Sequence, residues 1–107
     1  MSVFKTACLV CGLSSVGEAA DFFGVNSSTI KHWWSGRRWP PQGVWSQLAA
    51  LYDQIIQISE HALDTFDDEI DASSVQAIAE HEFGEPLPAH ARDAAMAMFV
   101  LTRFGEL

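Results

Sequence analysis

Basic residues are scarce in this chain of 107 residues, which has six Lys and Arg against 14 Asp and Glu and a formal net charge of −8. Taken as a whole, that balance argues against a partner as acidic as nucleic acid. No apolar run is long enough to cross a bilayer, and the N-terminal residues lack the basic-then-apolar order of a signal peptide. These absences predict a cytoplasmic protein that does not contact a membrane.

Cysteine is limited to Cys8 and Cys11, which form a C-x-x-C pair. A zinc site would need two more ligands at a matching spacing, and a redox pair would need a βαβ context. Neither is visible in the sequence. The pair is therefore predicted to consist of small apolar core thiols.

Catalytic motifs are also missing. There is no Gly-rich phosphate loop and no Ser/His/Asp arrangement, and His81-Glu82 lacks the second His of H-E-x-x-H. The sequence therefore predicts no enzyme, no catalytic residue, no metal and no cofactor. A metal site is a less favoured alternative, built from His61, His81, His90, Glu80, Glu82 and Glu85.

The charge is distributed unevenly along the chain. Residues 1–50 carry four basic and two acidic residues, a balance of +2, whereas residues 51–107 carry two basic and twelve acidic residues, a balance of −10. The basic residues of the first part cluster between Lys31 and Arg38. Because salt screens charges beyond about 10 Å, attraction to phosphate depends on the charge near the contact. The acidic part therefore does not prevent the first part from binding DNA.

A capping box predicts where a short helix begins, because Ser15 is followed three residues later by Glu18. Phe23 lies on the apolar face of this helix, together with two alanines. Gly24 then marks a sharp turn, since glycine tolerates the positive φ that such a turn requires. The pattern predicts a helix over residues 16–23 followed by a tight turn.

A second short helix is predicted over residues 27–35, capped by Asn26 or Ser27. Ile30 and Trp33 share its inward face. A short helix whose outer face is polar and free has the shape that enters a DNA major groove. Its outward side chains are Ser27, Ser28, Lys31, His32 and Ser35.

The positions Ala20, Gly24, Val25, Ile30 and Trp33 stand at the spacing of a known motif. They resemble the helix-turn-helix of lambda-repressor-like DNA-binding proteins (Cro/CI-type, XRE family). The following loop and the segment LAALY at 48–52 are similar to the same family, so that the resemblance covers roughly residues 5–55. It implies a DNA-binding domain whose base-reading residues lie early in the second helix.

Two positions depart from this family. Val16 stands where the family usually has a Gln that touches phosphate, so this contact is missing or is supplied by Ser14 or Ser15. Because the first helix expected at residues 4–13 also carries only one basic residue, Lys5, modest affinity is predicted for a single copy. Trp34 stands where the family usually has a carboxylate. Its ring is expected either in the core or stacked on the sugar–phosphate edge, and the core is favoured.

The predicted DNA contacts fall into two groups. Lys31 can donate to guanine acceptors, whereas His32 binds a base or a phosphate or is an exposed side chain without a role. The guanidinium forks of Arg37 and Arg38 suit phosphate oxygens, although a surface Arg pair can also serve only solubility. The residues assigned to bases are Ser27, Ser28, Lys31 and His32. Those assigned to phosphates are Ser15, Asn26, Ser35, Arg37 and Arg38.

The rest of the chain is predicted to be helical. A heptad-like seam indicates one long helix after Pro41, and an acidic linker or loop is expected at 64–74. A short helix at 74–83 and a nearly apolar helix at 89–104 follow. A chain of this length can scarcely cover such a helix alone, which predicts a dimer interface. The residues assigned to dimerisation are Ile55, Ile58, Ala94, Ala95, Met98 and Leu101.

The sequence thus predicts an all-α fold, with a lambda-repressor-like helix-turn-helix domain at 1–56 and an acidic helical dimerisation or partner region at 57–107. The predicted function is that of a homodimeric repressor that binds double-stranded DNA and reads an inverted repeat through the recognition helix 27–35 in the major groove. This layout resembles small phage-type regulators and anti-CRISPR-associated repressors. The alternative is an antitoxin or adaptor whose acidic half binds another protein, with DNA binding secondary.

Overall fold

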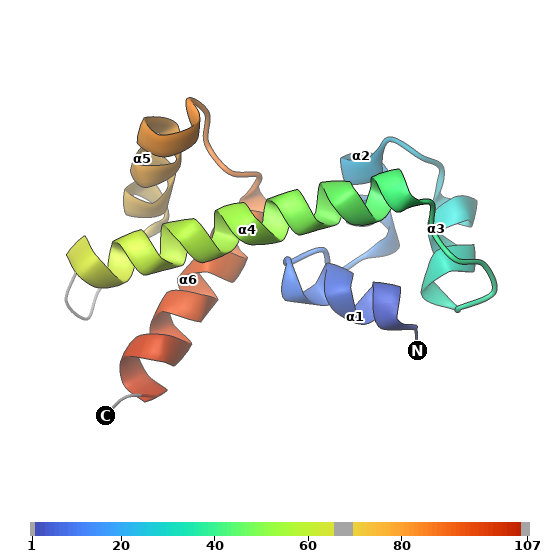
Figure 1. Cartoon of the computed structure of the whole chain (residues 1–107), viewed down its shortest axis with the longest axis horizontal. Helices are drawn as coiled ribbons and strands as arrows, with labels where there is room; N and C mark the ends of the chain where they lie inside the picture. The colour runs from blue at the N-terminus through green and yellow to red at the C-terminus, as the bar shows by residue number, and fades with distance from the viewer. Residues whose placement is uncertain (1, 66–69, 106–107) are drawn as a thin grey trace. The chain divides into compact units, whose positions relative to one another are not determined.

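The structure, a computed structural model, describes residues 2–65 and 70–105. These residues form six α-helices and no β-strand, which confirms the predicted all-α class (Figure 1). No helix in the described part of the chain is both long and apolar enough to cross a membrane. The helices are α1 (Val3–Val10), α2 (Val16–Phe23), α3 (Ser27–Trp34), α4 (Gln42–Thr65), α5 (Ala72–Phe83) and α6 (Ala89–Gly105).

The chain divides into two compact units, residues 1–51 and residues 52–107. The long helix α4, drawn from green to yellow in Figure 1, contributes its first part to unit 1 and its second part to unit 2. The domain boundary expected after residue 56 falls within this helix.

Each short helix of unit 1 begins directly after a residue whose side chain caps it. The Ser15 hydroxyl accepts a hydrogen bond from the Glu18 N–H at 3.1 Å, which confirms the predicted start of α2. Gly24 ends α2 with φ 68° and ψ 34°, a left-handed conformation. Between α1 and α2 the chain turns at Cys11 and Gly12, where Gly12 has φ 84°.

An aromatic cluster forms the centre of unit 1. Phe4 is buried in α1, and its ring centroid lies 5.7 Å from those of Phe23 and Trp33 and 5.3 Å from that of Trp45. The Trp33 and Trp45 rings meet Phe4 nearly edge-on, an arrangement that aromatic pairs favour. The thiols of Cys8 and Cys11 are also buried in unit 1, as predicted.

The predicted seam of α4 is buried at all positions but the first. Leu48 and Leu51 lie in the core, as do Ile55, Ile58 and Ala62 further along the helix. Val44 at the start of the helix is only half-buried. Apolar residues at steps of three and four thus give α4 one buried face along most of its length.

Unit 2 is held together by main-chain contacts as well as by its core. The Gln76 side chain of α5 bonds both the N–H and the carbonyl of Leu87, each at 2.7 Å. The Arg103 guanidinium of α6 donates to the Leu63 carbonyl of α4 at 2.7 Å. Each bond joins segments that are distant in sequence, so these side chains fix how α4, α5 and α6 pack within the unit.

The acidic segment expected as a linker or loop at 64–74 is shorter in the structure. Asp64 and Thr65 belong to α4, and α5 begins at Ala72 because the Asp71 carboxylate accepts the Ser74 N–H at 2.8 Å. This bond lowers the pKa of Asp71. Residues 66–69 of the predicted loop lie outside the described residues.

Candidate nucleic-acid interface

Helix α3 has one buried face, which fixes its orientation in unit 1. Ile30 and Trp33 are buried, and α3 packs against α1 and α2. The Ser2 hydroxyl donates to the Trp33 carbonyl at 3.0 Å, and the Ser2 N–H donates to the Trp34 carbonyl at 3.4 Å. Ser2 therefore ties the end of α3 to the start of α1 through two main-chain carbonyls and uses none of the outer side chains of α3.

The opposite face of α3 carries the predicted base-contacting residues. Ser27, Ser28 and Lys31 are exposed, and His32 is half-buried. The His32 carbonyl accepts bonds from the Ser35 hydroxyl at 3.1 Å and from the Arg38 N–H at 3.2 Å. Three of these four residues are therefore exposed to solvent, and His32 is only partly accessible.

The loop after α3 presents two cations. Arg37 and Arg38 are both exposed. The main chain of the loop is anchored on α3, because the Gly36 N–H donates to the Trp33 carbonyl at 3.2 Å and the Arg37 N–H donates to the Ser35 hydroxyl at 3.4 Å. The guanidinium groups are therefore free to contact anions while the backbone that carries them is held.

The other predicted phosphate contacts have structural partners in this chain. Asn26 caps α3, since its Oδ1 accepts from the N–H and the hydroxyl of Thr29, both at 2.9 Å. Ser15 caps α2, and Ser35 bonds the end of α3. All three side chains are exposed, but their oxygens already have bonds that hold the helix ends.

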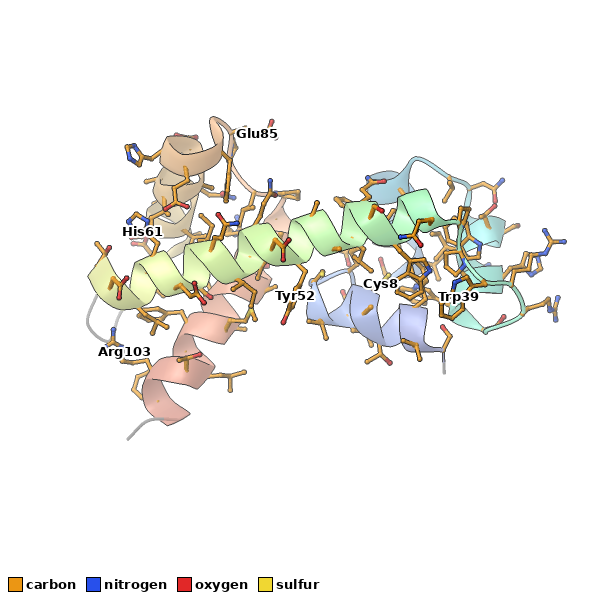
Figure 2. All side chains as sticks on the ribbon, viewed as in Figure 1. Cys8, Trp39, Tyr52, His61, Glu85 and Arg103 are labelled. Carbon is orange, nitrogen blue, oxygen red and sulfur yellow. The ribbon has the colours of Figure 1, made fainter. Side chains whose placement is uncertain are left out.

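The two tryptophans near the loop differ in exposure. Trp34 is half-buried, and the Lys5 ammonium lies 5.3 Å from its ring centroid. Trp39, which the sequence analysis did not select, is 73% exposed, and its ring lies on Trp45 with centroids 5.0 Å apart and an interplanar angle of 32° (Figure 2). The signal that could have found Trp39 is its place between two arginines and two prolines, where no helical periodicity predicts burial.

The residues assigned to dimerisation do not form one surface. Ile55, Ile58 and Ala95 are buried in the core of unit 2, because α4, α5 and α6 of a single copy already cover them. In a single copy these three residues are core residues, and their contact with a second copy stays a prediction. Ala94 and Met98 are half-buried, and Leu101 is 73% exposed.

The final helix is also less covered than its composition suggests. Val100 and Phe104 are exposed together with Leu101, so one apolar side of α6 faces outward in a single copy. The buried residues of this helix, Ala91 and Phe99 among them, lie on its other side.

The cysteines and the acidic residues form no chemical site in the described chain. Burial raises the pKa of both Cys8 and Cys11 to about 11, so they stay protonated thiols near neutral pH. His61 Nδ1 contacts the Glu82 carboxylate beside an open hollow of about 420 Å³. Within residues 2–65 and 70–105, however, no three His, Cys, Asp or Glu side chains are placed to hold a metal ion.

No family model, no curated protein and no solved structure matches this chain. Its function is therefore inferred from its own residues. In unit 1, exposed hydroxyl and cationic side chains gather on the outer face of α3 and in the basic loop, namely Ser27, Ser28, Lys31, Arg37 and Arg38.

Proposed function

We propose that this chain is a sequence-specific, double-stranded DNA-binding transcriptional regulator, a cytoplasmic homodimeric repressor that reads an inverted repeat. In this proposal α2, the Gly24 turn and α3 act as a helix-turn-helix of the lambda-repressor-like kind. Helix α3 enters the major groove, and the basic loop binds the phosphate backbone. The role is one of binding rather than catalysis.

The observation that carries the proposal is the two-sidedness of α3. Ile30 and Trp33 are buried, whereas Ser27, Ser28 and Lys31 project from the opposite face with no core to cover them. Hydroxyl and ammonium groups match the hydrogen-bonding edges of bases, and Lys31 suits the O6 and N7 acceptors of guanine. The exposed guanidinium groups of Arg37 and Arg38 follow directly and suit phosphates.

Local charge favours the same partner. No acidic residue occurs between Asp21 and Asp53, a segment that contains α3, the basic loop and the start of α4. The segment is therefore purely cationic, although the chain is acidic as a whole. A polyanion that comes within the screening length of physiological salt is therefore attracted to α3 and the basic loop.

The small number of cations predicts how strongly salt should affect binding. Lys31, Arg37 and Arg38 could neutralise three phosphates, which gives a slope of log K against log salt of about −2.7 for one copy and about −5.4 for two. Three phosphate contacts give only modest affinity for a single copy. Two copies bound to two half-sites about one helical turn apart would bind more tightly.

The test begins with selection of bound duplexes from a random pool, followed by anisotropy titrations of the selected site and of a scrambled site over a range of salt concentrations. We expect Lys31→Ala to relax the preference at one base pair and to cost about 1–3 kcal/mol. We expect Arg38→Ala to weaken both duplexes alike and to reduce the salt slope by about one unit per copy.

Arg92→Ala is the matched control, because it also removes one positive charge but lies in unit 2 beside Asp93. It should leave affinity and salt slope unchanged. Failure of the parent protein to shift any duplex at low salt would refute the function. Equal losses for Lys31→Ala on selected and scrambled duplexes would refute the base-reading role.

A second candidate function is favoured by the apolar side of α6. Val100, Leu101 and Phe104 are exposed in the strongly acidic part of the chain, a combination that suits a protein partner. The partner is a second copy in the repressor proposal and a different protein if the chain is an antitoxin or adaptor. Sedimentation of the full chain separates the two, since a dimer that Leu101→Asp dissociates supports the repressor and a monomer supports the adaptor.

A further inference from the structure

We propose that Trp39 is an additional DNA-contacting residue, whose outer ring face packs on a deoxyribose of the strand that Arg37 and Arg38 hold by its phosphates. This inference rests on the function proposed above and adds an apolar, salt-independent contact to it. Stacking on the sugar–phosphate edge is expected from the sequence only for Trp34, which is half-buried beside Lys5 in the structure.

The exposure of Trp39 is the first reason. Its side chain is 73% exposed, although the neighbouring aromatic residues Phe4 and Trp33 are buried in the core of the same unit. A large ring left in water forgoes the stabilisation that burial would provide, so an exposed tryptophan is more informative than a buried one. Tryptophan is also among the residues most enriched at the centres of binding surfaces.

The second reason is that the ring is held in place. The ring of Trp39 lies against that of Trp45, with centroids 5.0 Å apart, while 73% of the residue stays exposed. Pro40 follows and is buried, and a residue before proline is confined to extended backbone conformations. The bond from the Arg38 N–H to the His32 carbonyl fixes the preceding residue. Little conformational freedom is left to lose on binding, which favours a contact role.

The third reason is charge, which selects the occupant. Trp39 directly follows Arg37 and Arg38, both exposed, in the segment without acidic residues. A nucleic-acid strand offers phosphates with apolar sugar surface between them, so it can satisfy the guanidinium groups and the indole together. An apolar protein surface would leave the two cations unpaired.

The contact predicts a signature that separates it from the arginines. Trp39→Ala should weaken binding of the selected duplex about tenfold, the effect of losing roughly 55 Å² of apolar contact, with the salt slope unchanged. Trp39→Phe keeps a ring and should stay within about threefold of the parent. Arg38→Ala, in contrast, should lower the salt slope.

Fluorescence gives an independent readout in the parent protein. Trp33 is buried and Trp34 and Trp45 are half-buried, so Trp39 should account for most of the quenching by acrylamide. Saturation with the selected duplex should reduce this quenching. Trp39→Phe should remove both the quenchable component and its response to DNA.

Tyr52→Ala serves as the control for loss of an exposed aromatic ring outside the basic loop and should bind like the parent. Unfolding curves of Trp39→Ala verify that the variant is folded. If the parent binds no duplex, the proposed function fails, and this inference fails with it. This inference alone is refuted if the parent binds DNA, but the duplex does not reduce acrylamide quenching of the parent and Trp39→Ala binds with the affinity of the parent. Protection of Trp39 by an acidic protein but not by DNA would also overturn it.

Discussion

Replacing Gln76 with alanine should destabilise unit 2, because one side chain supplies two hydrogen bonds to a single residue. Gln76 Nε2 donates to the Leu87 carbonyl, and Gln76 Oε1 accepts from the Leu87 N–H, each at 2.7 Å. Leu87 is only 5% exposed, so water cannot easily replace the lost partner. Each bond contributes about 1 kcal/mol net, and a buried group left unpaired costs up to about 3 kcal/mol. We therefore expect the free energy of unfolding to fall by about 2–4 kcal/mol.

The assay is urea unfolding followed by far-UV circular dichroism and by tryptophan fluorescence. With a slope of about 1.5 kcal/mol/M, the midpoint of the dichroism transition should fall by about 1.3–2.7 M. All four tryptophans lie in unit 1, so their fluorescence reports that unit, and its midpoint should move less if the two units unfold separately.

Two further variants define the result. Gln57→Ala removes the same side chain from an exposed position of α4 and should change stability by less than about 0.5 kcal/mol. Gln76→Glu retains an acceptor for the Leu87 N–H but places a carboxylate against the Leu87 carbonyl, so we expect an intermediate or equal loss at neutral pH. If Gln76→Ala unfolds at the same urea concentration as Gln57→Ala, the two bonds contribute no stability and the reasoning is refuted.

Two other predictions concern unit 1. Gly24→Ala should destabilise the chain by about 1–2 kcal/mol, because φ is 68° there and the added Cβ would meet nothing within 4 Å, which leaves backbone strain as the only cost. Gly43 lies in α4, where an added Cβ would also meet nothing within 4 Å, so Gly43→Ala should be neutral or stabilise the chain by up to about 1 kcal/mol. If both substitutions shift the midpoint of thermal unfolding in the same direction, this reasoning is contradicted. Because burial raises the pKa of Cys8 and Cys11 from 9.0 to about 11, the unfolded chain releases these protons first as pH rises. The contribution of the two thiols to the free energy of unfolding should therefore be fully present below pH 9 and be lost between pH 9 and 11. In urea unfolding, a double alanine variant, which lacks both thiols, should lose less stability over this pH range.

The start and end of α2 could be predicted from sequence because they depend on short-range chemistry. Ser15 and Glu18 lie three residues apart, and the same spacing sets the bond that starts α2. Gly24 is the residue that a left-handed helix end favours. The choice between Asn26 and Ser27 as the cap of α3 required the structure, because both side chains can accept the same kind of bond.

The surface of unit 2 could not be predicted, because an apolar periodicity does not say what covers it. Ile55, Ala95 and Leu101 all fit the pattern of a packed helix, but the first two are buried by their own chain and Leu101 is exposed. The partner of a buried residue depends on how α4, α5 and α6 meet, which is a property of distant contacts such as the bond between Arg103 and the Leu63 carbonyl.

Trp39 escaped the sequence reasoning for a related reason. Hydrophobic periodicity locates core residues in helices, and Trp39 lies in a loop where no such period applies. The placement of its ring depends on Pro40, a local constraint, and on the ring of Trp45, a contact between separate segments.

Ile30 and Trp33 are the two buried residues of α3 and anchor this helix, whereas its remaining positions contribute less to the core. Under the proposed function, stability and recognition therefore depend on different side chains of the same eight-residue helix. A library that randomises Ser27, Ser28 and Lys31 should consequently yield mostly folded members, so this small scaffold is suited to directed evolution toward new target sequences.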